Sequence, residues 1–211
     1  MRPHFIMTRE EHIIKAATDV FMRYGIKSVN MDDMAKHLGM SKKTIYQHFK
    51  DKNDLVSRAV ETFNAREASE IDTICKESIN AIEEMFGINR WVVSLLSHIH
   101  PSVMFDLEKY YPTIASDLID HRNKMVFASM LANMKSGQKQ GFYRKDFKPE
   151  IVARIYIARL DMFFNAKLFP PDTFKAIDIY TETFKYHIRG IASEKGLEYL
   201  NKHYKNDSKK R

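Results

Sequence analysis

Apolar residues recur along most of this chain at a spacing of three or four positions, which is the period of an α-helix buried on one face. No segment shows the sustained two-residue alternation that is typical of a β-strand. We interpret all seven glycines and all six prolines as markers of helix boundaries, because they lie where the helical period stops or weakens. The pattern therefore predicts an all-α fold.

The first predicted helix lies between Thr8 and Gly25. Thr8 and Glu11 have the spacing of a capping box, in which each side chain accepts a hydrogen bond from the other residue's free backbone N–H. An apolar stripe at helical spacing follows, and Gly25 permits a left-handed C-cap. We expect this helix to form one wall of a small three-helix core.

Residues 30–50 are predicted to hold two short helices, each of about two turns. Asn30 is placed to cap the first helix and Ser41 to cap the second, while Gly39 lies in the turn between them. So short a turn with a glycine forces the two helices to cross sharply, which is the pattern of a helix-turn-helix. Asp51 is placed to cap a longer helix that follows.

The second of these short helices carries a row of hydrogen-bond donors. With Ile45 and Phe49 directed toward the core, the polar side chains point away from it or lie on the flanks, and none of them is acidic. Such a helix can read the major groove of DNA. For base edges the sequence predicts Lys42, Lys43 and Gln47. For phosphates it predicts Thr44, Tyr46, His48 and Lys52.

The segment that carries these features is residues 25–56, which read GIKSVNMDDMAKHLGMSKKTIYQHFKDKNDLV. It resembles the N-terminal DNA-binding domain of TetR-family transcriptional regulators, and the resemblance covers roughly residues 8–56. The family implies an all-α homodimer with a C-terminal domain that often binds an inducer. The family often has Ser or Thr where this chain has Asn30, so a hydroxyl contact to phosphate would here be an amide contact.

Beyond this segment the resemblance gives only the plan of the molecule. The predicted helices are roughly 52–70, 73–86, 88–99, 102–109, 112–136, 149–168, 171–189 and 196–204. In the family the last two long helices of each chain form a four-helix dimer interface. Two stripes are candidates for it: Ile151, Ile155, Ala158, Met162 and Phe163, and Phe174, Ile177, Tyr180, Phe184 and Ile188. Packing within one chain would also explain these residues.

The middle of the chain is rich in bulky side chains of the kind that line a pocket for an apolar or aromatic effector. The candidates are Phe86, Trp91, Met104, Tyr111, Phe127, Met130, Met134, Tyr156 and Phe163. For any single one of them an ordinary core position is the stronger interpretation, and no feature names a ligand.

Composition narrows the class of protein. A formal net charge of +7 and a pI of about 9.3 suit a polyanionic partner. No apolar run approaches the roughly 20 residues that span a bilayer, and no signal peptide is evident. A single cysteine, Cys75, fits a reducing cytoplasm. His98, His100 and His121 lack the spacing of a metal site, and no catalytic motif or cofactor site is found.

The sequence thus predicts a helix-turn-helix DNA-binding domain at 1–51 and a helical regulatory and dimerisation domain at 52–211. We expect a cytoplasmic homodimer that acts as a transcriptional repressor, binds a palindromic operator and responds to a ligand. An alternative stays open, namely a DNA-binding protein of the same fold that has no small-molecule effector. It would be controlled by a protein partner or act in chromosome organisation.

Overall fold

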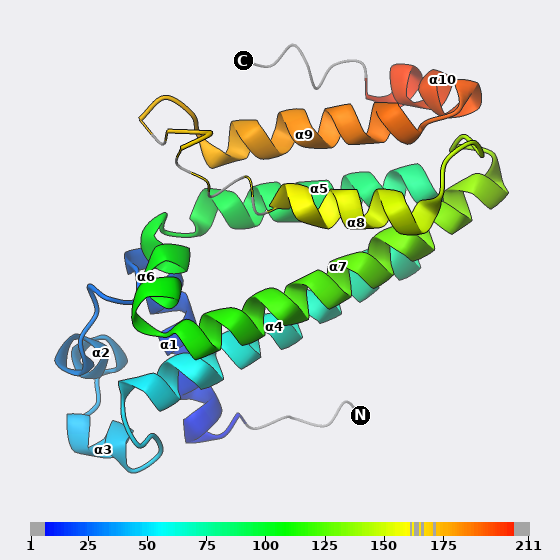
Figure 1. Cartoon of the computed structure of the whole chain (residues 1–211). Coiled ribbons are helices and arrows are strands. Elements are labelled where there is room, and N and C mark those ends of the chain that lie inside the picture. Colours follow the sequence, from blue (N-terminus) through cyan, green and yellow to red (C-terminus); the bar gives the residue numbers. More distant parts are fainter. Residues whose placement is uncertain (1–6, 161, 163–164, 166, 171, 205–211) are drawn as a thin grey trace, which may run out of the picture. The chain divides into compact units, whose positions relative to one another are not determined.

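The computed structural model describes residues 7–160, 162, 165, 167–170 and 172–204 (Figure 1). These residues form ten α-helices and no strand, which confirms the predicted all-α class. Within the same residues, no helix is both long and apolar enough to cross a lipid bilayer. The helices are α1 Arg9–Tyr24, α2 Met31–Leu38, α3 Lys42–Tyr46, α4 Lys52–Glu77, α5 Ala81–His98, α6 Ser102–Tyr110, α7 Pro112–Gln140, α8 Pro149–Leu160, α9 Ala176–Ile191 and α10 Glu194–His203.

The chain forms two compact units. The first comprises Met1–Ser69 and His98–Arg122, and the second comprises Glu70–Ser97 and Asn123–Arg211. The long helices α4 and α7 therefore contribute to both units. The functional division at residues 51 and 52 stays a prediction.

The core of the first unit joins α1, α2 and α3 to α6 and to the first parts of α4 and α7. Ile13, Met34, Ile45 and Leu55 come from four different helices, and each of them is 0% exposed. A fully buried side chain of this size contributes about 1.5–3 kcal/mol to folding. The predicted wall formed by α1 is confirmed, and it belongs to a core that extends beyond three helices.

The second unit has its own core, at whose centre lies a polar contact. The Tyr143 hydroxyl is 3.0 Å from both Ala81 O and Asn133 Oδ1, and Asn133 Nδ2 donates to Ala81 O over 2.9 Å. Tyr143 and Asn133 are each 1% exposed. Their hydrogen bonds compensate the cost of burying polar groups and tie the start of α5 to α7.

The interpretation of every glycine as a helix boundary is wrong. Three glycines have positive φ and do end helices: Gly25, Gly39 and Gly141. Four others lie inside helices: Gly87, Gly137, Gly190 and Gly196. A Cβ atom at Gly87 would lie 2.6 Å from Ile74 Cγ2, and one at Gly137 would lie 2.1 Å from the Tyr143 ring. At these two positions the glycine permits a neighbouring side chain to pack directly against the helix backbone.

Two predicted breaks between helices are absent from the structure. The structure has one helix, α5, where the sequence predicts a break at Gly87, and α4 continues to Glu77 without the break expected near residue 71. The chain breaks at 78–80, because Asn80 Oδ1 accepts hydrogen bonds from Ile82 N and Glu83 N over 2.9 and 3.0 Å. Asn80 thereby caps α5.

The helices predicted at 149–168 and 171–189 are also shorter at their facing ends. α8 ends at Leu160, and α9 begins only at Ala176. Thr173 N and Phe174 N both donate to Pro170 O over 2.9 Å, and Lys175 then has an extended backbone. This turn delays the start of α9, and the predicted start at residue 171 lies outside the described residues.

Most of the second predicted dimer stripe faces the interior of the second unit, although Phe174, which precedes α9, is 45% exposed. Tyr180, Phe184 and Ile188 are only 4%, 3% and 2% exposed within the single chain. The Phe184 ring meets the Phe86 ring edge to face, with 5.1 Å between the centroids. These side chains are therefore unavailable to a partner chain.

Candidate DNA-binding site

Helix α2 is fixed at its start by side-chain hydrogen bonds and at its end by the conformation of Gly39. Asn30 Oδ1 accepts from Asp32 N and Asp33 N over 2.8 and 2.9 Å, and Asn30 N donates to Asp33 Oδ2 over 3.1 Å. These bonds form a capping box and confirm the predicted cap at Asn30. At the other end Gly39 takes the left-handed conformation, with φ 62° and ψ 30°. Both ends of α2 are thus determined by local residues.

Helix α3 is held by two buried side chains and one cap. Thr44 N donates to Ser41 Oγ over 3.0 Å, and Ile45 and Phe49 are 0% and 1% exposed. The helix ends at Tyr46 and is shorter than predicted. A hydrogen bond from Phe49 N to Ile45 O over 3.1 Å nevertheless continues the turn, so both apolar residues face the core.

The structure brings the predicted DNA contacts of this segment onto one part of the first unit. Lys42, Lys43, Tyr46 and Gln47 are exposed, while Thr44 and His48 are half-buried. Asn30 is exposed as well, but its carbonyl oxygen is occupied by the cap of α2. The side-chain NH₂ group of Asn30 is therefore the part that is left to meet a phosphate. Which of these side chains touch DNA stays a prediction.

Lys42 has an intramolecular partner that sequence reasoning missed. Its Nζ lies 2.9 Å from Asp32 Oδ2, and the hydrogen bond raises the pKa of Lys42. The two residues are ten positions apart and meet only because the turn folds α3 back against the start of α2. A phosphate or base edge that takes up Lys42 must therefore compete with the Asp32 carboxylate.

Lys52 occupies a more enclosed position than a simple phosphate contact would need. Its Nζ donates to Ile26 O over 2.6 Å and lies 5.9 Å from the centroid of the Phe21 ring. Burial, followed by the charge of Lys27, lowers the pKa of Lys52. Lys52 thus links the start of α4 to the loop between α1 and α2.

The same loop is held from α6 by Asp106. One oxygen of this carboxylate, Oδ2, accepts from Ile26 N and Lys27 N, both over 2.9 Å, and from Ser102 Oγ over 3.2 Å. Asp106 is 4% exposed. The sequence could have indicated a buried acidic residue here, because Asp106 lies on the apolar stripe of α6 beside Leu107. A carboxylate in such a position needs hydrogen-bond partners.

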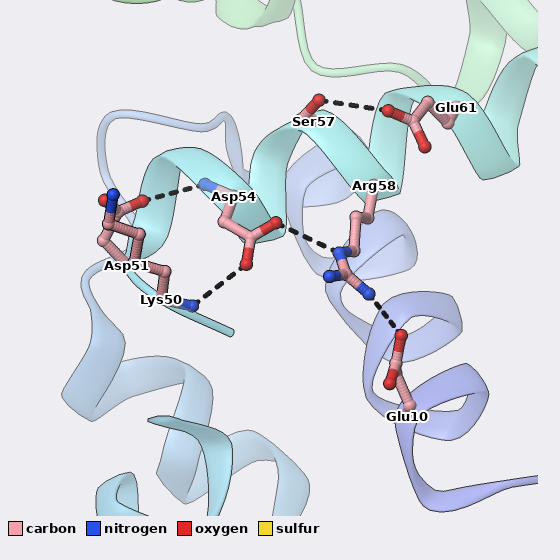
Figure 2. A network of polar contacts seen from close by, with 7 residues as sticks. All are labelled: Glu10, Lys50, Asp51, Asp54, Ser57, Arg58 and Glu61. Atoms are coloured by element: carbon pink, nitrogen blue, oxygen red, sulfur yellow. Dashed lines mark hydrogen bonds and ion pairs between the residues drawn. The ribbon is translucent and has the colours of Figure 1, made fainter. Parts of the chain in front are cut away.

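A further network fixes the start of α4 (Figure 2). Asp54 N donates to Asp51 Oδ1, and Lys50 N donates to Asp54 Oδ2, each over 2.9 Å. Arg58 Nε donates to Asp54 Oδ1 over 3.0 Å, and the Arg58 guanidinium also contacts Glu10 of α1. The bond from Lys50, followed by Arg58, lowers the pKa of Asp54. The segment that leaves α3 is thereby anchored to α1 through α4.

The predicted effector-binding residues are divided between the two units. Met104 and Tyr111 pack against the core of the first unit. Five residues belong to the core of the second unit or pack against it: Phe86, Phe127, Met130, Met134 and Tyr156. Trp91 is half-buried in the second unit, and Phe163 lies outside the described residues. Their role in ligand binding stays a prediction.

The other candidate groups show no reactive arrangement in the part of the chain that the structure describes. No three potential metal ligands from His, Cys, Asp and Glu gather there. Cys75 is half-buried, and its Sγ donates to Glu84 Oε1 over 3.6 Å. Burial, with the Glu84 charge, raises the pKa of Cys75 to about 11, so the thiol is a poor nucleophile.

Comparison with known proteins also indicates a helix-turn-helix regulator. Residues 13–59 match the model of a family described as bacterial regulatory proteins, tetR family. The HTH-type transcriptional repressor KstR2 of Mycolicibacterium smegmatis is 21% identical over 150 residues, which are 70% of this chain and 73% of that protein. The uncharacterized HTH-type transcriptional regulator YvaF of Bacillus subtilis is 28% identical over 142 residues, which are 65% of this chain and 72% of that protein.

The fold is also that of solved regulators. A transcriptional regulator from Cytophaga hutchinsonii superposes with a TM-score of 0.69 at 18% identity, over 87% of this chain and 98% of that chain. The matched segment covers the capped helix-turn-helix and the first turns of α4, where the predicted DNA contacts lie. The family is a class of regulators and not of enzymes. The matched DNA-binding segment and the relatives therefore support a DNA-binding transcriptional regulator of the TetR family.

Proposed function

We propose that the protein acts in the cytoplasm as a homodimeric repressor that reads a palindromic operator with two copies of α3. The observation that carries this proposal is the short, capped helix α3, which is fixed by Ile45 and Phe49 and exposes two lysines, with an exposed glutamine directly after it. Two such helices would enter successive major grooves about 34–36 Å apart. That the relative from Mycolicibacterium smegmatis is named a repressor supports the direction of regulation.

An exposed apolar face on α8 supports dimerisation. Ile151 and Ile155 are 54% and 55% exposed in the single chain, and Ala158, one turn further along, is also exposed. The spacing of 151, 155 and 158 places them on one side of the helix. A contiguous apolar face of this kind is typical of a protein–protein interface. We propose that α8 packs against its copy in a second chain.

Ligand control of the repressor is part of the proposal. A ligand that binds one arrangement of the two DNA-binding heads better than another would shift the population and release DNA. The predicted effector residues remain candidates for that pocket. If none of a broad set of effectors changes operator binding, regulation through a protein partner becomes the better account.

The proposal is tested by selecting bound duplexes from a random pool, with binding then measured at several salt concentrations. A palindromic consensus with a steep salt dependence is expected, because a dimer contacts two half-sites and several phosphates. Binding without any consensus would instead support a role in chromosome organisation. No binding at all would contradict the proposal.

Replacement of Lys43 or Gln47 by alanine is expected to relax operator preference. Each well-placed base contact discriminates by about 1–3 kcal/mol, so the ratio of operator to random-DNA affinity should fall by roughly tenfold or more. Lys15, exposed on α1, gives a matched control as Lys15→Ala. The base-reading roles are wrong if the Lys43 and Gln47 variants keep the parent's specificity ratio.

Replacement of Lys52 by alanine is expected to weaken binding to operator and random DNA alike. Loss of one phosphate contact should reduce the slope of log affinity against log salt by about one unit per chain. Because Lys52 also donates to Ile26 O, the melting temperature is recorded beside the slope. A variant with an unchanged slope and a lower melting temperature would show that Lys52 is only a structural link.

A further inference from the structure

A pocket of about 290 Å³ lies in the second unit between α5, α9 and α10. Among the predicted effector residues that the structure describes, Phe86 alone lines it. Its wall combines aromatic and basic side chains, which is the combination that holds a small anion with a flat body.

Aromatic rings form one side of the pocket. The Phe86 ring stacks on the Tyr204 ring with 3.5 Å between the centroids and an interplanar angle of 13°. Phe86 also meets the Phe184 ring edge to face. Phe86 and Phe184 are 7% and 3% exposed, so these rings are held firmly in the core. They offer a rigid apolar surface to a planar ligand.

The other side of the pocket is basic. Arg90, Lys185 and Arg189 line it, and none of the described lining residues is acidic. Lys185 Nζ is paired with Glu182 Oε1 at 2.9 Å, which leaves the two guanidinium groups as the main positive charge. Arginine is well suited to hold a carboxylate because its planar fork can donate two parallel hydrogen bonds.

The neighbouring carboxylate of Glu83 is already satisfied by other groups. Tyr199 and Tyr204 donate their hydroxyls to its two oxygens over 2.9 and 2.6 Å. Arg90 and Tyr204 line the same pocket, so the Arg90 side chain borders the stacked rings. The aromatic wall and the positive charge are thus held next to each other.

Asn89 supplies a third feature. Its Oδ1 atom is buried and has no hydrogen-bond partner among the described residues. A buried acceptor without a donor is costly, at about 1–3 kcal/mol. Because Asn89 also lines the pocket, a ligand hydroxyl or N–H group is placed to supply the missing donor.

We propose that this pocket binds an aromatic carboxylate that also carries a hydrogen-bond donor. The ring lies against Phe86 and Tyr204, and the carboxylate is held by Arg90 and Arg189. The donor completes the hydrogen bonding of Asn89. This site is inferred from the second unit alone and does not depend on DNA binding.

The test is a fluorescence titration of the full chain with 6-hydroxy-2-naphthoate, which has a ring, a carboxylate and a hydroxyl that is too far from the carboxylate to bond to it. Saturable binding of one molecule per chain is expected. Removal of both guanidinium groups in an Arg90→Gln, Arg189→Gln variant should weaken binding by at least about tenfold. The neutral analogue 2-naphthol, which lacks the carboxylate, should bind more weakly by a similar factor.

Arg154→Gln is the matched control. Arg154 is an exposed arginine of the same unit whose guanidinium lies over the Phe127 ring, and it does not line this pocket. The control variant should bind the probe like the parent chain. No saturable binding, equal loss in the control, or equal affinity for 2-naphthol would each overturn the proposal. Operator affinity measured without the probe separates failure of this site from failure of the proposed function.

Discussion

An Asp106→Ala variant is expected to lose about 2–4 kcal/mol of its free energy of unfolding. The substitution removes the acceptor for Ile26 N and Lys27 N and leaves the Ile26 N–H buried without a partner. A loss of this size should lower the melting temperature by about 5–15 °C in a chain of this length. Thermal unfolding followed by circular dichroism measures it.

The same variant should bind operator more weakly even below its melting temperature. The loop that Asp106 holds leads directly into Asn30 and α2, and Lys52 holds it from the other side. If this loop has its binding geometry only a tenth of the time, affinity falls by about tenfold. Operator titration at a fixed low temperature tests this.

Glu108→Ala is the control for Asp106→Ala, because Glu108 is an exposed acidic residue on the same helix. It should change neither the melting temperature nor DNA affinity appreciably. Asp106→Asn keeps an acceptor oxygen and should lie between the parent and the alanine variant. An Asp106→Ala variant as stable as the Glu108→Ala variant would show that these hydrogen bonds contribute little.

The helix-turn-helix could be predicted from sequence because its determinants are local. Each capping box joins two residues that are three positions apart in the sequence. The structure has both boxes, one formed by Thr8 and Glu11 and the other by Asn30 and Asp33. Gly39 ends α2 through its own backbone conformation. A pattern of this kind needs no knowledge of the rest of the fold.

The contacts that position this site from a distance could not be predicted in the same way. Asp106 reaches a loop about eighty residues earlier in the chain, and no local pattern reports which backbone N–H groups it meets. The roles of Gly87 and Gly137 cannot be predicted from the sequence for a related reason. The sequence does not distinguish a glycine that ends a helix from one that lies inside a helix and leaves room for a neighbouring side chain. The distinction depends on where Ile74 and Tyr143 lie in the folded chain.

The two stripes proposed for a dimer interface show what burial adds to periodicity. Both repeat at helical spacing, yet Tyr180, Phe184 and Ile188 are buried in their own chain, whereas Ile151 and Ile155 are exposed. Hydrophobic periodicity identifies a face that must be covered, and it does not say whether the same chain covers it. The α8 face is therefore retained as a candidate interface.

An Ile155→Glu variant is accordingly expected to dissociate the proposed dimer. Ionised glutamate in an apolar helix–helix interface costs several kcal/mol, and about 3 kcal/mol corresponds to a change of roughly a hundredfold in the dimer dissociation constant. Operator affinity should fall by at least a similar factor, because two half-sites are then no longer bound by one particle. Sedimentation equilibrium and operator titration measure the two effects.

Ile79→Glu is the matched control, since Ile79 is 82% exposed and lies in the short connection between α4 and α5. Both substitutions replace an exposed isoleucine by a charge, so a general effect of charge or solubility would appear in both variants. Dissociation of the Ile155→Glu variant alone would assign the interface to α8. If that variant stays dimeric and binds operator like the control, α8 is not the dimer interface. The exposed apolar face of Ile151, Ile155 and Ala158 would then need a different partner.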